Sequence, residues 1–494
     1  MKNRFCRVSA ALLAVASPLT ALAVIGPDVT VSTIDNFTKY GTVSGISGFA
    51  MTTVSCNIGD RNAIWIDCTN PDDRNCNQHP VIGQNFYKLH VVNGATRFEM
   101  IGMAWLKHGF CGADASGPNC AGSQPGFPAS CQNDGTCDSL GIGCTDTYGA
   151  GLNAAQDDLG PRSEINPWSG YYPYPYVRAW NATGNAIYKR LQIQNTDLVA
   201  NANLATYPMY FAESQYVVTD EQPNVRHNNV SYRQAQVSGT VSNPGVAFVS
   251  GRGTVPRQPA LNAWATHDPG VQITTVDLPN DGRLMLGYKV TQLANGRWHY
   301  EYALYNMNSH QAVRSFGVPA PDWYVYENQG FKDIPYHSGE VFDGTDWPHT
   351  KTQMALTWNT QTNSQNINAN ALRWGTIYNF RFDSDAPPGP GNVSLQLFQG
   401  INQTLPTPTT PNPPAVAPPA AAVLMAAVVP QFKGDMNCDG LLNNLDIDPF
   451  VMAITFPSQY QQTFPNCNLM NGDVNNDGVF TNFDIDPFVA LLIE

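Results

Sequence analysis

Charge is scarce in this sequence, and positive charge is scarcest. Only 13% of the 494 residues are charged, and 26 Lys and Arg face 39 Asp and Glu, giving a formal net charge of −13. Proteins that bind nucleic acid or anionic lipid present a basic surface to the phosphates. The composition therefore argues against both partners. The 43% of hydrophobic residues still indicates a globular chain, not a disordered one.

The sequence also lacks the short motifs of common enzymes. It has no H-E-x-x-H, G-x-S-x-G or Walker A motif. Residues 149–154 match G-x-G-x-x-A but do not join a strand to a helix, so dinucleotide binding is not expected. Carboxylates available for glycoside hydrolysis include Glu213, Glu301, Glu327, Glu340 and Asp343. Glycoside hydrolysis needs a pair of carboxylates at a defined separation in space, which the sequence does not give. The catalytic residues therefore stay unknown, and whether the protein is an enzyme stays open.

The N-terminal apolar run is too short for a membrane-spanning helix. It extends from Ala10 to Ala23, follows three basic residues, and is interrupted by Ser17 and Pro18. It ends in Ala21-Leu22-Ala23, a small-x-small cleavage site. We therefore predict a signal peptide over residues 1–23 and a secreted or cell-surface protein with no membrane span in the mature chain.

Cysteine usage agrees with export. Removal of the signal leaves ten cysteines, eight between Cys56 and Cys144 and two at Cys438 and Cys467, with no C-x-x-C pair. Even groups in an exported chain indicate disulfides, up to four in the first group and one in the second. Eight cysteines allow 105 pairings, so the connectivity in the first group stays open.

Alternating runs joined by Asn-Gly turns indicate a mainly β fold. Residues 86–92 and 95–101 flank Asn93-Gly94, and residues 284–293 and 297–305 flank Asn295-Gly296. Asn-Gly favours the type I′ turn of a two-residue hairpin. In the last run, residues 298, 300, 302 and 304 should share one face and residues 299, 301, 303 and 305 the other. We predict two β-sandwich-like domains, over residues 24–240 and 241–400.

Proline then marks a linker. Residues 405–419 read LPTPTTPNPPAVAPP, which favours an extended polyproline-II spacer. The apolar run at residues 420–429 is about half the length needed to span a bilayer. We assign residues 401–430 to the linker, with this run continuing it or packing on the tail.

An internal repeat follows. The segments GDMNCDGLLNNLDIDPFVMAI, from Gly434, and GDVNNDGVFTNFDIDPFVALL, from Gly472, align without a gap. Each places oxygen donors as a twelve-residue calcium loop requires, with Gly at position 6 for a sharp turn. The predicted ligands at positions 1, 3, 5, 7, 9 and 12 are Asp435, Asn437, Asp439, Leu441, Asn443 and Asp446 in the first loop, and Asp473, Asn475, Asp477, Val479, Thr481 and Asp484 in the second. Positions 441 and 479 would act through their backbone carbonyls.

Charge and proline constrain this tail further. From Gln431 onward it holds nine acidic residues and one basic residue, Lys433, so its net charge is 1 − 9 = −8. Clustered carboxylates repel one another, so we expect folding of the tail to be coupled to two calcium ions. Proline is tolerated only in the first turn of a helix, so Pro449 and Pro487 predict helices that start near Asp446 and Asp484.

The two loops have the form D-x-N-x-D-G, close on Asp, lack an entering helix and precede an apolar segment. In these features they resemble type I dockerins. The resemblance covers residues 431–494. It implies a small α-helical module that docks onto a cohesin-like or cell-surface protein. It also implies partner selection by loop positions 10 and 11, here Asn444 and Leu445 in the first loop and Asn482 and Phe483 in the second. The prolines, the wide spacing of the two copies and the cysteine pair depart from that family.

A second resemblance involves the first domain. A histidine at 79, an F/Y-x-L strand, a hairpin, a K-x-G-F-C segment and a later G-C-x-D-T-Y are similar in order to the β-sandwich of lysyl-oxidase-type proteins. That family binds copper through H-x-H-x-H. The matching positions here are Asn75, Asn77 and His79, so the resemblance implies the fold without copper or amine oxidation.

The sequence thus predicts an exported, calcium-dependent modular protein whose tail attaches it to a partner. The dockerin resemblance implies that its β domains bind or process extracellular polysaccharide. The alternatives are a glycoside hydrolase in polysaccharide catabolism and a non-catalytic structural or adhesion protein. Aromatic stretches at residues 168–176 and 321–326 suit either sugar stacking or a β core.

Overall fold

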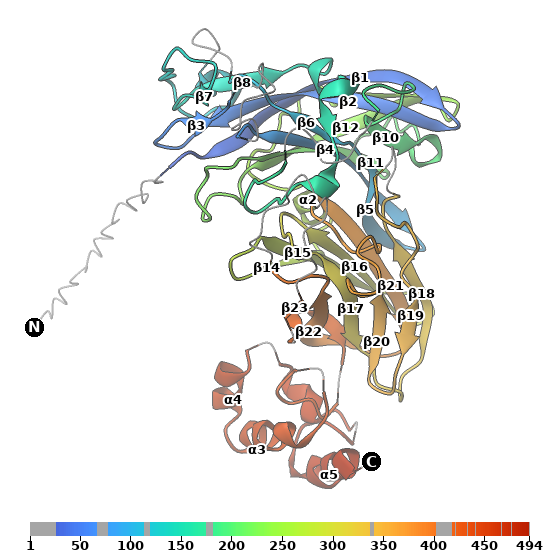
Figure 1. The fold of residues 1–494 in the computed structure, drawn as a ribbon. Coiled ribbons are helices and arrows are strands. Elements are labelled where there is room, and N and C mark those ends of the chain that lie inside the picture. The colour runs from blue at the N-terminus through green and yellow to red at the C-terminus, as the bar shows by residue number, and fades with distance from the viewer. Residues whose placement is uncertain are drawn as a thin grey trace, which may run out of the picture.

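The computed structural model describes residues 26–66, 78–112, 119–173, 181–335, 340–401, 417–419 and 421–493, apart from 432, 440, 466 and 476. The fold is mainly β with short helices near the C-terminus, as predicted. Figure 1 shows an elongated molecule in which a first β unit, a second β unit and a helical tail follow one another. Among the described residues, no helix is long and apolar enough to cross a membrane. The predicted signal peptide lies outside the described residues.

The first unit is built on one eleven-stranded sheet. Its main order is β1-β2-β10-β5-β4-β11-β12-β13, with β6, β8 and β9 paired beside it. The strands are β1 (Val29–Val43), β2 (Ile46–Asn57), β4 (Val81–Val92), β5 (Ala95–Met103), β6 (Leu106–His108), β8 (Thr145–Tyr148), β9 (Leu159–Gly160), β10 (Leu191–Gln194), β11 (Met209–Val217), β12 (Val230–Thr240) and β13 (Asn243–Phe248). A two-stranded sheet of β3 (Ala63–Ile64) and β7 (Ser139–Leu140) and the short helix α1 (Cys120–Ser123) lie in the cysteine-rich region.

This sheet coils back on itself. Strand β1 packs against β11, β12 and β13, far from it in the strand order. The apolar core enclosed in this way includes Phe49, Phe86 and Tyr210, and all three are buried. Because β13 extends to Phe248, the first unit continues past the predicted boundary at residue 240.

The second unit is a sandwich of two five-stranded sheets, in the orders β14-β15-β16-β21-β18 and β19-β20-β17-β22-β23. Its elements are α2 (Asn262–His267), β14 (Gln272–Asp277), β15 (Arg283–Gln292), β16 (Trp298–Asn306), β17 (Val313–Pro319), β18 (Tyr326–Lys332), β19 (His349–Lys351), β20 (Ala355–Asn359), β21 (Thr376–Ser384), β22 (Pro388–Leu397) and β23 (Val423–Pro430). Side chains from both sheets fill the core between them, Phe316 and Phe380 among them.

Strand β23 corrects the predicted linker. Residues 423–430 all pair antiparallel with residues 388–395 of β22. Met425, Ala427 and Val429 turn into the sandwich core and are almost fully buried. The apolar run therefore belongs to the second unit because its alternate side chains fill that core. Of the predicted linker, residues 402–416 lie outside the described part.

The two β units share a core. In β16, Tyr300 and Tyr302 face the sandwich interior, whereas Ala303 and Tyr305 contact residues of the first unit, as the alternation predicted. The shared core also contains Trp264 of α2, which is fully buried. The two predicted β domains thus form one continuous body.

Both predicted hairpins are present, with different turns. Strands β4 and β5 are joined by Asn93 and Gly94, whose φ values of 51° and 88° suit a type I′ turn. Between β15 and β16, Gly296 has a φ of 84° but Asn295 is not among the residues with positive φ. The amide of Gly296 donates to the carbonyl of Leu293, as in a type I turn followed by a left-handed glycine. The prediction of a type I′ turn is wrong at this second hairpin.

Four disulfides join described cysteines: Cys56–Cys120, Cys111–Cys137, Cys131–Cys144 and Cys438–Cys467. The first three tie the cysteine-rich segment to β2 and to itself. The fourth links the first predicted calcium loop to the segment that leads to the second. Cys68 and Cys76 lie outside the described residues.

The tail is a small helical module. It contains α3 (Ile447–Thr455), α4 (Pro457–Thr463) and α5 (Ile485–Ile493). Single 3₁₀ turns, η5 (Asn444–Asp446) and η7 (Asn482–Asp484), precede α3 and α5, so both helices start where the prolines predicted. Strand β23 and the 3₁₀ turn η6 (Leu469–Gly472) precede the loops, so neither loop has an entering α-helix.

Candidate functional site

The two repeated loops adopt the same local structure. In the first, the Asn437 side-chain oxygen accepts from the amide of Asp439 at 2.9 Å, and Asp439 accepts from the amide of Leu441 at 2.8 Å. In the second, the equivalent bonds from the amides of Asp477 and Val479 measure 2.8 and 2.9 Å. In each loop the side-chain amide at position 3 also donates to the carboxylate at position 5, at 3.1 and 3.2 Å, so the two side chains lie together. Such short side-chain turns are typical of Asn and Asp in tight loops.

The aspartates at position 12 close the loops. Asp446 is fully buried and accepts from the amides of Met436 and Asn437 on one oxygen and of Asn443 on the other, at 2.9–3.1 Å. Burial raises the pKa of the Asp446 carboxyl, these amide bonds lower it, and the negative charge of Asp439 raises it. The carboxylates of positions 5 and 12 therefore lie close enough to repel each other.

Asp484 closes the second loop in the same way. It is fully buried and accepts from the amides of Asn475 and Thr481 at 3.1 and 2.9 Å. At position 1, Asp473 accepts from the amides of Asp477 and Gly478 at 3.2 Å. Gly478, at position 6, has a φ of 88°, which only glycine adopts at no steric cost.

The donor set fits calcium. Each loop carries carboxylate, amide and backbone oxygens at its predicted ligand positions, and the second loop adds the Thr481 hydroxyl. These are the ligands that this hard cation prefers. Within the described residues, no three His, Cys, Asp or Glu side chains are close enough to form a metal cluster by themselves. Gly440, at position 6 of the first loop, lies outside the described residues.

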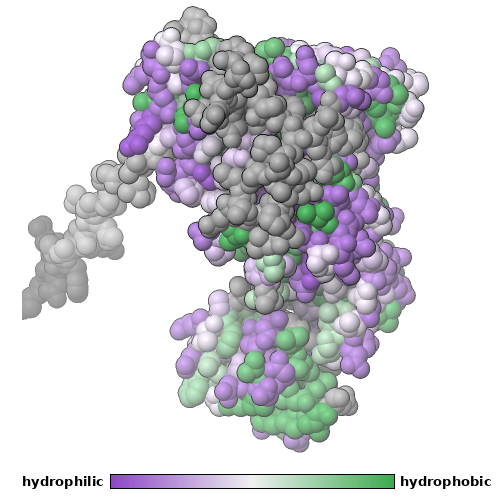
Figure 2. Space-filling view, viewed as in Figure 1, coloured by the Kyte–Doolittle hydropathy of each residue, from purple (hydrophilic) through white to green (hydrophobic). Residues whose placement is uncertain are grey.

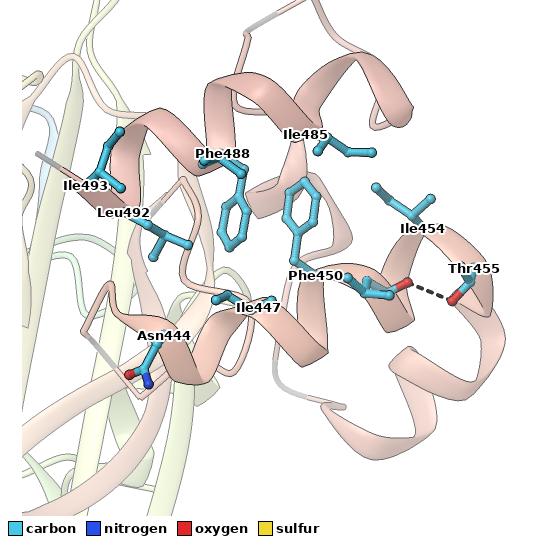
Figure 3. Close-up of a pocket in the computed structure, with 11 residues that line it drawn as sticks. Asn444, Ile447, Phe450, Ile454, Thr455, Ile485, Phe488, Leu492 and Ile493 are labelled. Atoms are coloured by element: carbon cyan, nitrogen blue, oxygen red, sulfur yellow. Dashed lines mark hydrogen bonds between the residues drawn. The ribbon is translucent and has the colours of Figure 1, made fainter.

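An apolar groove of about 500 Å³ runs between α3 and α5. Its lining comes largely from matching positions of the two repeats: Ile447 with Ile485, Phe450 with Phe488, and Val451 with Val489. The rings of Phe450 and Phe488 stack at 3.9 Å between centroids and form its floor (Figure 3). In the space-filling view, hydrophobic residues gather over the tail at the end of the molecule (Figure 2).

The predicted partner-binding residues are exposed, and one of the four lines this groove. Asn444 lines it, and Leu445 and Phe483 have exposed fractions of 62% and 75%. Asn482 is also exposed. Large apolar side chains exposed in this number are unusual for a soluble surface and mark interaction sites. Positions 10 and 11 of both loops are thus exposed, and Asn444 is the one that lines the groove.

The tail is mounted on the second β unit. The Gln431 side chain donates to the carbonyl of Met470 at 3.0 Å, and Asn392 of β22 donates to the carbonyl of Cys438 at 2.7 Å. Tyr324 lies near the second loop: burial raises its pKa, and the charges of Asp385 and Asp473 raise it further. The loop side of the module therefore contacts the β body, which leaves the groove between α3 and α5 open.

Two of the candidate catalytic carboxylates are held inside the β body. Glu213 is fully buried and accepts from the hydroxyl of Tyr87 and the amide of Ala260, both at 2.7 Å. Glu301 forms two 2.9 Å bonds with the guanidinium of Arg97 across the junction of the two units. Both side chains stabilise contacts between the β units.

The other three candidates are divided between surface and junction. Glu327 is exposed and pairs with Arg297, and Asp343 is exposed in a turn. The Glu340 carboxylate accepts from the amide of Arg162 at 2.7 Å. Burial raises the pKa of Glu340. The geometry identifies no acid–base pair among these five residues.

A small cavity lies near Glu340 at the junction of the units. It has a volume of about 40 Å³ and is lined in part by Arg162, His310, Arg373 and Trp374. This volume accommodates a few water molecules. It is too small for a sugar ring.

The sequence analysis did not identify a pair of buried histidines in the first β unit. His79 Nε2 and His108 Nδ1 are 2.8 Å apart, both rings are buried, and Tyr172 packs against both. Burial lowers the pKa of His108 well below its ordinary value, and His79 and Lys107 lower it further. Antiparallel pairing of β4 with β6 brings the two residues together. Their separation of 29 positions in the sequence carried no signal.

Only one of the three positions matched to the copper motif of lysyl oxidases is among the described residues. Asn75 and Asn77, the other two positions of the matched motif, lie outside the described residues. His79 is described, and its ring nitrogen is engaged with His108.

A scan of the sequence against known protein families finds no matching family. A search of curated proteins finds no similar sequence. The resemblances to dockerins and to lysyl oxidases rest on the motifs themselves.

Proposed function

We propose that the tail is a calcium-dependent attachment module that joins an exported β-rich protein to a separate partner protein. The observation that carries this proposal is the coincidence of two features. Two twelve-residue loops with oxygen donors at matching positions support the helices α3 and α5. Those same helices form an exposed apolar groove that Asn444 helps to line, and Leu445, Asn482 and Phe483 are exposed at positions 10 and 11 of the loops.

Calcium would be held by the carboxylate, amide and hydroxyl oxygens of positions 1, 3, 5, 9 and 12 and by the carbonyls of Leu441 and Val479. The ion would supply the positive charge that these clustered carboxylates need. Asp446 and Asp484 each hold a loop against the start of its helix. Whether the loops are ordered therefore determines the position of α3 relative to α5. Loss of the ion is therefore expected to disturb the groove.

The partner is a protein with an apolar patch bordered by basic side chains. Asp448 and Asp486 are exposed on the helices beside the groove. The tail carries a net charge of −8, which two calcium ions reduce to −4. Charge complementarity of this kind sets orientation and association rate. A cohesin-like or cell-surface protein, as the dockerin resemblance implies, meets this description.

The predicted signal peptide and the four disulfides support an extracellular location for this assembly. The resemblance to dockerins also suggests polysaccharide as the target of the β body. Trp323, with 44% of its surface exposed, is available for stacking on a sugar ring. The positions of the five carboxylates give no support to glycoside hydrolysis, so the proposal contains no catalytic step.

The attachment is tested by capture with the full-length chain. We expect one cell-envelope protein of the source organism to bind in calcium, to be released by EDTA and by high salt, and to be lost with Val451→Asp/Val489→Asp. Each of these valines is about half exposed, so the substitutions leave the helices intact. Val241→Asp, at an exposed turn of the first β unit, is the matched control and should bind normally.

Two outcomes would contradict the proposal. Binding that survives both EDTA and the groove substitutions would place the contact elsewhere. A dimer of the free protein that disappears with the groove substitutions would assign the groove to a second copy of this chain.

A further inference from the structure

A pocket of about 290 Å³ lies at one end of the sandwich sheet β19-β20-β17-β22-β23. Strand β17 begins there, and β20 and β22 end there, because both pair antiparallel with β17. The volume is close to the lower end of the roughly 300–1,000 Å³ of small-molecule sites, so it suits a molecule with one ring. Its polar lining comes from Arg314, Thr362, Asn363 and Ser364, and Phe398 and Pro418 contribute apolar walls.

A β-bulge brings Arg314 to this pocket. The register of β17 against β22 shifts between Val313 and Ser315, so Arg314 is an extra residue in the strand. Val313 and Phe316 both lie in the sandwich core although they are three positions apart. Regular alternation from Phe316 would place residue 314 in that core as well. The bulge instead re-aims the side chain, as bulges beside binding sites do.

The charge of Arg314 has no acidic partner in the described part of the chain. Its half-buried guanidinium forms no ion pair or hydrogen bond with any described residue. Burial lowers the pKa of Arg314, and no described carboxylate counters that shift. The segment that leads to the pocket-lining residue Ala417, residues 401–416, contains no Asp or Glu. A partly desolvated cation of this kind is stabilised by an anion that enters the pocket.

The loop after β20 adds neutral polar groups to the same pocket. The amide and the hydroxyl of Thr362 both donate to the side-chain oxygen of Gln365, at 2.9 Å, which fixes the loop. Asn363 is only 6% exposed, and its side-chain oxygen accepts no hydrogen bond from any described residue. Buried acceptors normally have a donor, and a hydroxyl of a bound molecule would supply one here. The exposed hydroxyl of Ser364 lies 3.1 Å from that of Thr362.

We propose that this pocket binds a sugar ring that carries a carboxylate, that is, a uronic acid unit. The planar guanidinium of Arg314 would donate two parallel hydrogen bonds to the carboxylate. Ring hydroxyls would pair with the Asn363 oxygen and with the hydroxyls of Thr362 and Ser364. The inference goes beyond the attachment proposed above, because neither the calcium loops nor the groove takes part.

The test is calorimetric titration of the full-length chain, in calcium, with glucuronate. We expect glucuronate to bind, and glucose, which lacks the carboxylate, to bind about tenfold more weakly or worse. Arg314→Gln should weaken glucuronate by about tenfold or more, and Arg314→Lys, which keeps the charge without the fork, should fall between it and wild type. Arg252→Gln, at an exposed position of the first β unit, is the matched control and should bind like wild type.

Four results would overturn the inference. Glucuronate that does not bind, or that binds equally to wild type and Arg314→Gln, would exclude the pocket as its site. Glucose that binds as tightly as glucuronate would exclude a role for the carboxylate. Acetate or inorganic phosphate that binds more tightly than glucuronate would assign the pocket to a different anion.

Two further measurements keep these results interpretable. The denaturation midpoint of Arg314→Gln should stay close to that of wild type, because the side chain makes no hydrogen bond with a described residue. Val451→Asp/Val489→Asp, which changes the tail groove, should bind glucuronate normally. Failure of the sugar-acid site would therefore leave the attachment module untouched, and the reverse also holds.

Discussion

His299 lies between two carboxylates on neighbouring strands. Its Nδ1 is 2.6 Å from Asp383 and its Nε2 is 3.2 Å from Glu301, which also binds Arg97 of the first unit. Burial lowers the pKa of His299, but hydrogen bonds to Glu301 and Asp383 outweigh it, so its pKa ends above the ordinary value. The carboxylates therefore favour the protonated form of the ring, which balances their charge where the two β units meet.

His299→Gln is expected to destabilise the protein in a pH-dependent way. The raised pKa means that the stabilisation is fully present below the unfolded-state pKa of about 6.5 and is lost as pH rises through the folded-state pKa. We expect a loss of about 1.5–3 kcal/mol at pH 5.5, as for a hydrogen bond to a charged group, and a smaller loss at pH 9. Denaturant unfolding at the two pH values measures the difference.

The exposed His349→Gln is the control for losing an imidazole and should show no such dependence. A loss from His299→Gln that grows with pH would mean that the neutral ring makes the stabilising contact.

Single residues were predictable where spacing in the sequence defines them. The predicted ligand positions of both loops follow from a twelve-residue pattern, and they stay a prediction. The His79–His108 pair and the Arg97–Glu301 contact depend on strand pairing and on packing between units. The sequence separation of such pairs carries no information about their distance, so they could not be predicted.

Among the elements, β23 was the least predictable. Its residues are mostly Ala and Val without polar alternation, and the neighbouring β22 begins with Pro and Gly, which are rare in strands. A strand buried in a sandwich has a continuous apolar sequence. The same sequence is compatible with a linker helix or a segment that packs on the tail. The hairpins were predictable because Asn-Gly acts locally, whereas the identity of the second turn depended on the register of its strands.

Two neighbouring residues of β23 test its assignment. Met425 is 2% exposed in the sandwich core, and Leu424 is 44% exposed. Met425→Asp should lower the free energy of unfolding by about 3 kcal/mol or more, because it buries a charge and removes core packing. Leu424→Asp, the matched control, should change it by less than about 1 kcal/mol. Equal, small effects on the denaturation midpoint would show that residues 423–430 do not belong to the sandwich.

For the whole molecule, the sequence predicted the order of parts but not their contacts. Two β regions and a duplicated tail were expected, and all three are present (Figure 1). The shared core of the β units and the mounting of the tail on β22 could not be predicted, because they join residues far apart in the chain. The resulting molecule holds the two repeated loops against the β units and presents the groove between α3 and α5 in the helical tail.

The central claim is that this tail binds calcium. Equilibrium dialysis of the full-length chain at about 1 mM free calcium, within the range of extracellular modules, measures the stoichiometry directly. The account predicts two ions per chain, one in Asp439→Ala or Asp477→Ala and none in the double variant. A chain that retains no calcium at this concentration, or one whose bound calcium is unchanged in the double variant, would contradict it.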